Sequence, residues 1–487
     1  MKKIIISIFM MGFTIIFLCG FIVKEDKKEV TDNDRIIYSI NNITNNLINI
    51  SNLNKREQDL ICATSKGLFS KNIDGEIIPE IAESYEINDS GIEYVFKIKE
   101  DIFWSDGSKI TVNDIYNFLK ELIFLQDKND VVVLYDIYGV NDYKNKKVSF
   151  ENGVAITCRD NEIKIRLNNK NDKFIDELTK PQYRLRKRIQ LWSQMDTFYS
   201  NIIYSGDYKI ITMNSEEIEL ENVTGNGNEI VMKKDNNTEE AMAAFKVGNR
   251  DIIINPPENE LNDLNQKGNL LTYPSNKGEY LYIDEKSTNM IASVRGAIYK
   301  NICEAIDEYE STNSMKVEWA EGSFIRADKE NVNLIQSRKV SINTISDLND
   351  INNLSICAIS NIENKKICEY LSNWFKENKS IKLKYYLLDK DDYKEAQINN
   401  KYSMYLLSNE ETFSRKTLFY ESIKDLFSTT EKDIYEKYKN TDENYYLLEE
   451  DLLNSYRILP LFYYNDNIAI SNKVSGVKMD YYGNLIF

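Results

Sequence analysis

Residues 65–122 have the sequence SKGLFSKNIDGEIIPEIAESYEINDSGIEYVFKIKEDIFWSDGSKITVNDIYNFLKEL, which predicts a strand, a tight turn and a helix in succession. Apolar and more polar side chains alternate over residues 92–98, as expected of a strand with one buried face. The Ser-Asp-Gly-Ser run at 105–108 predicts a turn, because glycine tolerates a positive φ. Thr111 and Asp114 then resemble a capping box that opens a helix with apolar residues at three-to-four spacing.

The rest of the 487-residue chain also alternates short strands with amphipathic helices. The expected strands lie at residues 36–40, 208–212, 217–220, 229–232, 251–254, 382–388, 458–464 and 467–471. The expected helices lie at residues 55–69, 238–247, 294–306, 362–375 and 445–456. This order predicts the α/β class with mixed sheets, and the length is enough for roughly three domains of about 150 residues.

Composition excludes several classes of function. With 61 basic and 77 acidic side chains the formal charge is −16, which argues against a nucleic-acid partner. The sequence contains no His, so the commonest general base and the commonest transition-metal ligand are both missing. The acidic residues show no spacing typical of a catalytic carboxylate pair. We therefore expect a protein that is not an enzyme and that holds neither a metal nor a cofactor.

The N-terminus predicts export and attachment to a membrane. Lys2 and Lys3 precede the uncharged residues 4–23, and a charged run follows at 24–29. The uncharged segment is long enough to span a bilayer, with the rest of the chain outside the cytoplasm. Cys19 lies in a sequence like a bacterial lipoprotein box, in which the cysteine is lipidated, although the large Leu18 precedes it. An uncleaved signal anchor is the alternative, and either form would tether the protein at the outer face of the cell membrane.

Five further cysteines follow Cys19, and an odd number cannot all pair. No Cys-x-x-Cys spacing occurs among them, so neither a metal site nor a redox motif is indicated. Cys62 and Cys303 each lie among apolar residues in expected helices, and we expect them to be small buried apolar side chains.

Several stretches together resemble one family, the extracytoplasmic solute-binding proteins of peptide-type ABC transporters (family 5), which are the oligopeptide- and dipeptide-binding lipoproteins. Residues 65–122 carry the strongest resemblance. The matching positions are Gly67, Leu68, Gly75, Pro79, Ala82, Glu83, Ser84, Tyr85, Trp104, Ser105, Asp106, Gly107, Thr111 and Asp114. Residues 204–211, 238–254, 293–308 and the C-terminal tail from residue 458 resemble further family stretches in the same order.

The resemblance implies a two-lobed clamp of the periplasmic-binding-protein type with an extra inserted subdomain. The expected segments are a signal or anchor segment with its tether (1–30), lobe I (31–70, 204–278 and 457–487), the inserted subdomain (71–203) and lobe II (279–456). Ligand is expected in the cleft, with closure favoured by ligand binding.

The resemblance also suggests ligand-binding residues, and each has a structural alternative. Asn255 follows an expected strand, where its amide either contacts the ligand main chain or caps a turn before a proline pair. Glu410 and Glu411 stand where family members place an Asp that pairs with the ligand α-ammonium; otherwise they are exposed loop charges. Tyr135 and Tyr138 either reach the cleft from the inserted subdomain or pack at its solvent edge.

The function implied by the resemblance is a tethered extracellular receptor that captures peptides, in particular oligopeptides, for an ABC importer. Its expected partners are a peptide ligand, the ABC permease and ATPase subunits and the membrane, and we expect a monomer. The alternative is a peptide-sensing or signalling protein that kept the clamp without a dedicated permease.

Overall fold

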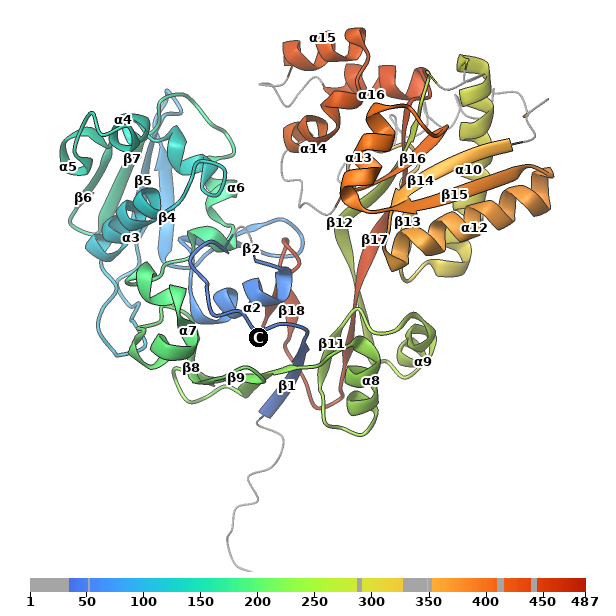
Figure 1. Ribbon diagram of the computed structural model, residues 1–487. Coiled ribbons are helices and arrows are strands. Elements are labelled where there is room, and N and C mark those ends of the chain that lie inside the picture. Colours follow the sequence, from blue (N-terminus) through green and yellow to red (C-terminus); the bar gives the residue numbers. More distant parts are fainter. Residues whose placement is uncertain are drawn as a thin grey trace, which may run out of the picture. The chain divides into compact units, whose positions relative to one another are not determined.

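The structure is a computed structural model that describes residues 35–50, 53–286, 291–326, 348, 353–409, 416–438 and 445–487. The chain forms two compact units (Figure 1). Unit 1 comprises residues up to Leu270 together with Ile468–Phe487, and unit 2 comprises Leu271–Asn467. The chain therefore crosses between the units at the start of strand β12 (Leu270–Ile283) and near the end of strand β17 (Ile458–Ile470).

A mixed sheet forms the first part of unit 1. Its strands run in the order β11-β1-β10-β9-β8, and the end of β17 pairs with β11. The bounds are β1 Arg35–Ile40, β8 Tyr208–Met213, β9 Glu217–Asn222, β10 Glu229–Lys234 and β11 Ile252–Ile254. Strand β1 lies between β10 and β11 and is parallel to both. About 190 residues separate β1 from β10 in the sequence, so this pairing joins distant parts of the chain. Helices α2 (Lys55–Thr64) and α8 (Thr238–Lys246) accompany the sheet, and the strands expected here are confirmed.

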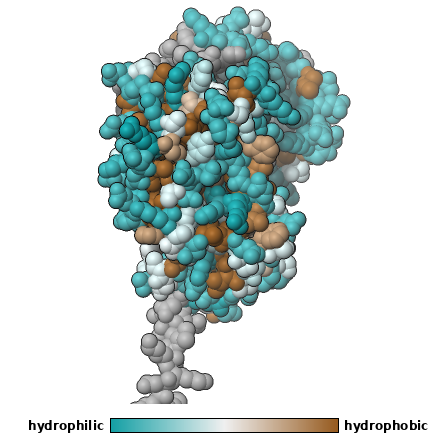
Figure 2. All heavy atoms as spheres, turned by 90° about the vertical axis from the view of Figure 1, so that its left-hand side faces the viewer, coloured by the Kyte–Doolittle hydropathy of each residue, from teal (hydrophilic) through white to brown (hydrophobic). Residues whose placement is uncertain are grey.

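Residues 65–122 lie in the second part of unit 1 and form the expected strand, turn and helix. Strand β5 (Glu93–Ile98) buries alternate side chains, and it lies in an antiparallel sheet of order β4-β5-β7-β6. Helix α3 (Val112–Leu125) begins with the expected capping box, in which Thr111 Oγ1 accepts from the Asp114 backbone N–H and Asp114 accepts from the Thr111 N–H. Figure 2 shows the surface on the left-hand side of Figure 1. It is mainly hydrophilic, with apolar side chains in separate patches.

Short elements complete unit 1. The strands are β2 Phe69–Lys71, β3 Ile77–Pro79, β4 Ala82–Ile87, β6 Ile156–Arg159, β7 Glu162–Arg166, β18 Lys478–Met479 and β19 Leu485–Ile486. The helices are η3 Val132–Asp136, α4 Val140–Lys144, α5 Phe150–Gly153, α6 Phe174–Leu178, η4 Pro181–Tyr183, η5 Ile189–Ser193, α7 Met195–Phe198, η6 Tyr199–Asn201, η7 Glu258–Glu260 and α9 Leu261–Gln266.

Unit 2 contains the other strands of the hydrogen-bonded sheet to which β1 belongs, covered by helices. Their order is β15-β14-β16-β12-β17, and β13 pairs with β17 off this path. The strands are β13 Val317–Trp319, β14 Asn353–Ile359, β15 Lys382–Leu388 and β16 Met404–Asn409. The helices are α10 Ala292–Asn313, α12 Ile362–Lys379, α13 Lys390–Ile398, α14 Lys416–Ile423, η9 Lys424–Leu426, α15 Thr429–Tyr438 and α16 Tyr445–Asn454. One continuous core joins the sheet to these helices. The fold is therefore mixed α/β throughout, as predicted.

Two elements differ from the expectation. Helix α2 ends at Thr64 because Ser65 takes an extended backbone, and the Leu185 N–H then donates to the Lys66 carbonyl at 2.7 Å. The two C-terminal strands expected at 458–464 and 467–471 form the single strand β17. Neighbouring segments hydrogen-bond the polar residues between them, since the Asn465 N–H donates to the Lys316 carbonyl at 2.7 Å.

Cys62 and Cys303 are buried, as predicted, and so are Cys357 and Cys368, whereas Cys158 is partly exposed. Cys19 and the predicted signal segment lie outside the described residues. Within the part of the chain that the structure describes, no helix has the length and apolar character needed to cross a bilayer.

Candidate ligand-binding site

Asn255 is exposed at the end of β11 in unit 1, and its backbone is left-handed with φ 51°. Asparagine adopts this conformation more readily than most residues, because its short amide can hydrogen-bond locally. The strand that leads to it is held by Asp251, whose carboxylate accepts from the Ile37 N–H at 3.0 Å and from Ser471 Oγ at 2.7 Å. Asp251 is fully buried, so the start of the three-residue strand that leads to Asn255 is fixed by satisfied hydrogen bonds.

A buried ion pair precedes the same strand. The Arg250 guanidinium donates to both carboxylate oxygens of Asp235, at 2.9 Å and 2.8 Å, and Ser39 Oγ donates to one of them at 2.6 Å. These hydrogen bonds join Ser39 in β1 and Asp235 directly after β10 to Arg250 before β11. The ends of β1 and β10 and the start of β11 are therefore held together by one buried polar group.

The two predicted tyrosines have different surroundings. Tyr135 is buried in the core of the part of unit 1 that contains α3. Tyr138 is 49% exposed, and the Arg166 guanidinium lies 4.7 Å from the centre of its ring. Tyr138 thus offers an accessible aromatic surface next to a cation, whereas the ring of Tyr135 is enclosed by protein.

A buried polar cluster lies in unit 2, where β12, β16 and β17 run side by side. Its centre is Glu279 on β12, which is 1% exposed. Ser408 Oγ on β16 lies 3.0 Å from Glu279 Oε2 and 3.1 Å from Asn364 Oδ1 on α12. On the other side, the Tyr464 hydroxyl on β17 donates to Glu279 Oε1 at 3.3 Å. We refer to these four residues as the Glu279 cluster.

Both hydrogen bonds of Ser408 in this cluster are satisfied when Glu279 is protonated. Ser408 has one hydroxyl proton but stands between two acceptor oxygens. A proton on Glu279 completes the chain, because Glu279 then donates to Ser408 and Ser408 donates to Asn364. Burial raises the pKa of Glu279 to about 8. The hydrogen bonds that the ionised carboxylate would accept from Ser408 and Tyr464, and the nearby Lys277 ammonium, offset only part of that rise.

Two charged residues border the Glu279 cluster. Lys277 Nζ lies 2.7 Å from Glu363 Oε2, with side chains that are 20% and 45% exposed, and 4.7 Å from the centre of the Tyr464 ring. Glu363 stands in the first turn of α12, where the helix dipole favours a carboxylate. The border of the cluster therefore presents one charge of each sign to solvent.

Glu410 and Glu411 lie outside the described residues. The last described residue before them is Asn409, which pairs with Gly278 at the end of the β12–β16 ladder. Their role in binding an α-ammonium stays a prediction, as do the roles of the other predicted ligand-binding residues.

The sequence pattern does not predict the burial of Glu279. It shows only an acidic residue directly before the apolar run Tyr280 to Ile283, and such a residue usually marks the exposed start of a strand. The burial comes from strand pairing with β16, which lies more than a hundred residues later. Among the described residues, no group of His, Cys, Asp and Glu side chains is arranged to hold a metal ion.

Comparison with known proteins adds a family match. Residues 76–302 match the model of the "Bacterial extracellular solute-binding proteins, family 5 Middle". The oligopeptide-binding protein AliB of Streptococcus pneumoniae is 26% identical over 109 residues, which cover 21% of this chain and 17% of AliB. The matched part thus spans about a sixth of that relative.

Solved structures share the fold over almost the whole chain. NikA from Brucella suis, in complex with Fe(III)-EDTA, has a TM-score of 0.69 at 15% identity and covers 92% of this chain and 98% of its own. The murein tripeptide-binding protein MppA of Escherichia coli has a TM-score of 0.60 at 15% identity and covers 92% and 96%. These matches confirm the predicted periplasmic-binding-protein-like fold, and the family model confirms the resemblance to family 5.

Proposed function

We propose that this protein captures peptides outside the cytoplasm and delivers them to an ABC importer, because residues 76–302 match the model of the bacterial extracellular solute-binding proteins, family 5 Middle. The family match is the observation that carries the proposal. The continuous resemblance of fold supports it, because the clamp architecture requires both units and not only the matched segment. In this proposal ligand binding is the whole task, and the peptide leaves the protein chemically unchanged.

Binding of peptides is tested with the purified chain that lacks its first 30 residues. We expect peptides of two to ten residues to raise the melting temperature, since a ligand at a hundred times its Kd adds ~2.7 kcal/mol to stability. Mass spectrometry after binding should recover the peptide intact. The absence of any shift, together with no peptide retained from the expression host, would contradict the proposal.

Asn255 is the proposed contact to the peptide main chain in unit 1, because it is exposed at the end of a strand that buried groups hold rigid. Asn255→Gly removes the amide and keeps a residue that tolerates φ 51°. We expect weaker binding of all peptides, irrespective of their termini. Asn400→Gly is the matched control, because Asn400 has the same φ of 51° on a loop of unit 2. Equal effects of the two substitutions would remove Asn255 from the site.

Glu410 and Glu411 are the proposed partners of the ligand α-ammonium. The β12–β16 ladder ends directly before them, beside Lys277 and Glu363, so a zwitterionic peptide would meet charges of both signs there. Glu410→Gln with Glu411→Gln should weaken peptides with a free N-terminus more than their N-acetylated forms. A similar loss for both forms would show that the two carboxylates do not recognise the ammonium.

Partners and location are proposed on the same basis. We propose attachment to the outer face of the membrane through lipidated Cys19 or an uncleaved anchor, and association with permease and ATPase subunits. Metabolic labelling with a fatty-acid analogue, compared with Cys19→Ala, separates the two forms of attachment. Copurification with a permease would support import, whereas peptide binding without any permease would leave the sensing alternative.

A further inference from the structure

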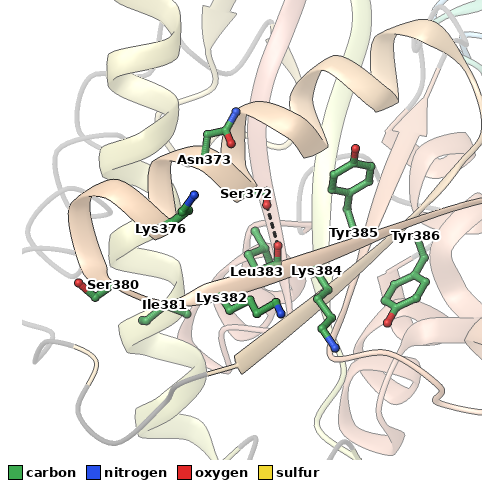
Figure 3. Close-up of a pocket in the computed structure, with 10 residues that line it drawn as sticks. All are labelled: Ser372, Asn373, Lys376, Ser380, Ile381, Lys382, Leu383, Lys384, Tyr385 and Tyr386. Atoms are coloured by element: carbon green, nitrogen blue, oxygen red, sulfur yellow. Dashed lines mark hydrogen bonds between the residues drawn. The ribbon is translucent and has the colours of Figure 1, made fainter.

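A groove of about 850 Å³ runs along strand β15 in unit 2 (Figure 3). It lies between β15 and the last turns of α12, and the side chains that matter here are Lys376, Lys382, Leu383, Lys384, Tyr385 and Tyr386. Figure 3 shows Lys384 and Tyr386 extending from one side of β15, whereas Leu383 and Tyr385 lie on the side of α12. We call this the β15 groove.

The groove borders an open edge of the sheet. Among the described strands, β15 pairs with β14 alone, and it does so in parallel register over its full length from Lys382 to Leu388. Each residue of an edge strand whose amide points outward offers a free N–H and C=O to a further strand. Ser372 Oγ donates to the Leu383 carbonyl at 2.7 Å, which satisfies one such acceptor from the α12 side. In the described part of the chain, the other outward-facing backbone groups of β15 pair with no further strand.

The charge of the groove is opposite to that of the chain. Of the described residues that line it, three are lysines and none is a carboxylate, although the chain carries a net charge of −16. Within the described residues, Lys376, Lys382 and Lys384 take part in no ion pair, whereas the neighbouring Lys379 binds Glu304 at 2.9 Å. The groove therefore holds three ammonium groups that no described side chain neutralises.

The spacing of the lysines matches an added strand. Lys382 and Lys384 are two positions apart and both exposed, so their side chains project from the same face of β15. Carboxylates two positions apart in a paired strand would face them across the ladder, where opposite charges stabilise the pairing. A second copy of this chain that paired through its own β15 would instead place lysine opposite lysine. Like charges directly opposite each other destabilise such a pairing.

Ordered aromatic rings form the rest of the contact surface. Tyr386 packs against Tyr402 with ring centres 4.5 Å apart, and the Tyr385 hydroxyl donates to Glu369 at 3.1 Å. Rings held in this way supply contact area with little loss of side-chain entropy on binding.

From this geometry we propose that β15 is a docking edge for an extended acidic segment of a partner protein. The segment pairs with β15 through its backbone, and its alternate carboxylates bind Lys382 and Lys384. This mode is β-strand addition, in which backbone hydrogen bonds provide affinity and alternate side chains provide specificity. The surface lies within unit 2 and does not depend on the proposed peptide-capture function.

The test uses a fluorescein-labelled peptide, acetyl-TEVEVEVT-amide, and the purified chain with its capture site saturated by a tight-binding peptide where one is found. We expect binding in fluorescence anisotropy that weakens as salt is raised, because the Debye length shrinks below about 8 Å above roughly 0.15 M. Lys382→Glu with Lys384→Glu should weaken binding roughly tenfold or more. Lys390→Glu with Lys394→Glu is the matched control, since both lysines are exposed on α13 outside the groove.

Hydrogen exchange identifies the location independently of affinity. The acidic peptide should slow amide exchange within residues 381–388 in the wild type and not in the double variant of β15. A peptide of the same sequence with alternate backbone nitrogens methylated, so that it cannot pair, should fail to bind. The proposal is overturned if the control variant loses binding equally, if the methylated peptide binds equally, or if protection appears elsewhere and not at β15.

Discussion

Replacement of Glu279 by Gln should make the stability of unit 2 less dependent on pH. In the structure Ser408 Oγ lies 3.0 Å from Glu279 Oε2 and the Tyr464 hydroxyl donates to Glu279 Oε1 at 3.3 Å, so a protonated Glu279 can donate to Ser408 while it accepts from Tyr464. A glutamine amide reproduces both roles, because its NH₂ group donates to Ser408 and its oxygen accepts from Tyr464. The variant therefore keeps the hydrogen bonds of the protonated acid and removes its ability to ionise.

The magnitude follows from the pKa of Glu279, which burial raises from 4.5 to about 8. The folded state binds this proton more tightly than the unfolded state, so the stabilisation is fully present below pH 4.5 and is lost as the pH rises to about 8. At ~1.4 kcal/mol per pKa unit, the loss over that window is roughly 5 kcal/mol.

Urea unfolding at several pH values from 5 to 8.5 measures this effect. Relative to the wild type, Glu279→Gln should be close to neutral at pH 5 and more stable by several kcal/mol at pH 8.5. Glu363→Gln is the matched control, because it removes a partly exposed carboxylate next to the same cluster and should change stability by less than about 1 kcal/mol. Parallel pH profiles for the wild type and Glu279→Gln would refute the assignment of a protonated, buried Glu279.

Three further substitutions test the packing of unit 1 by shifts in unfolding midpoint. Thr111→Ala removes the N-cap of α3 and should cost about 1 kcal/mol; an unchanged midpoint would contradict a stabilising capping box. In Gly206→Ala the new Cβ would lie 2.3–2.5 Å from backbone atoms at the C-terminal end of α2, so it should destabilise by more than the ~1 kcal/mol expected for Gly268→Ala, which has a positive φ but open space. The reverse order would refute the close approach. Asp235→Asn leaves the Arg250 guanidinium buried without its charged partner and should cost ~3–5 kcal/mol, and a cost below 1 kcal/mol would show that water reaches the pair.

Local patterns allowed much of unit 1 to be predicted. The alternation in β5 and the capping box of Thr111 with Asp114 depend on residues a few positions apart, and both are confirmed. The end of α2 and the continuity of β17 depend on hydrogen bonds to distant segments, such as Leu185 and Lys316, so sequence periodicity does not report them. The ends of an element differed from the prediction where hydrogen bonds to distant segments, and not local ones, determined them.

Less of the candidate site could be predicted from the sequence, because it too depends on contacts between distant segments. Asn255 was identified from the strand before it and a resemblance, but its left-handed backbone is visible only in the structure. Glu279 became important only when the ladder with β16 and the contact with Tyr464 buried it. A lone acidic residue beside an apolar run does not predict such burial.

The burial of the cysteines has a practical consequence for spectroscopy of this protein. Burial raises the pKa of the Cys303 and Cys368 thiols to about 12 and that of Cys357 to about 11, so almost no reactive thiolate exists at neutral pH. Cys62 is equally enclosed, and its pKa is raised in the same direction. In a chain without its N-terminal segment, a maleimide dye attached to an engineered surface cysteine should therefore label that position selectively once the partly exposed Cys158 is replaced by Ser.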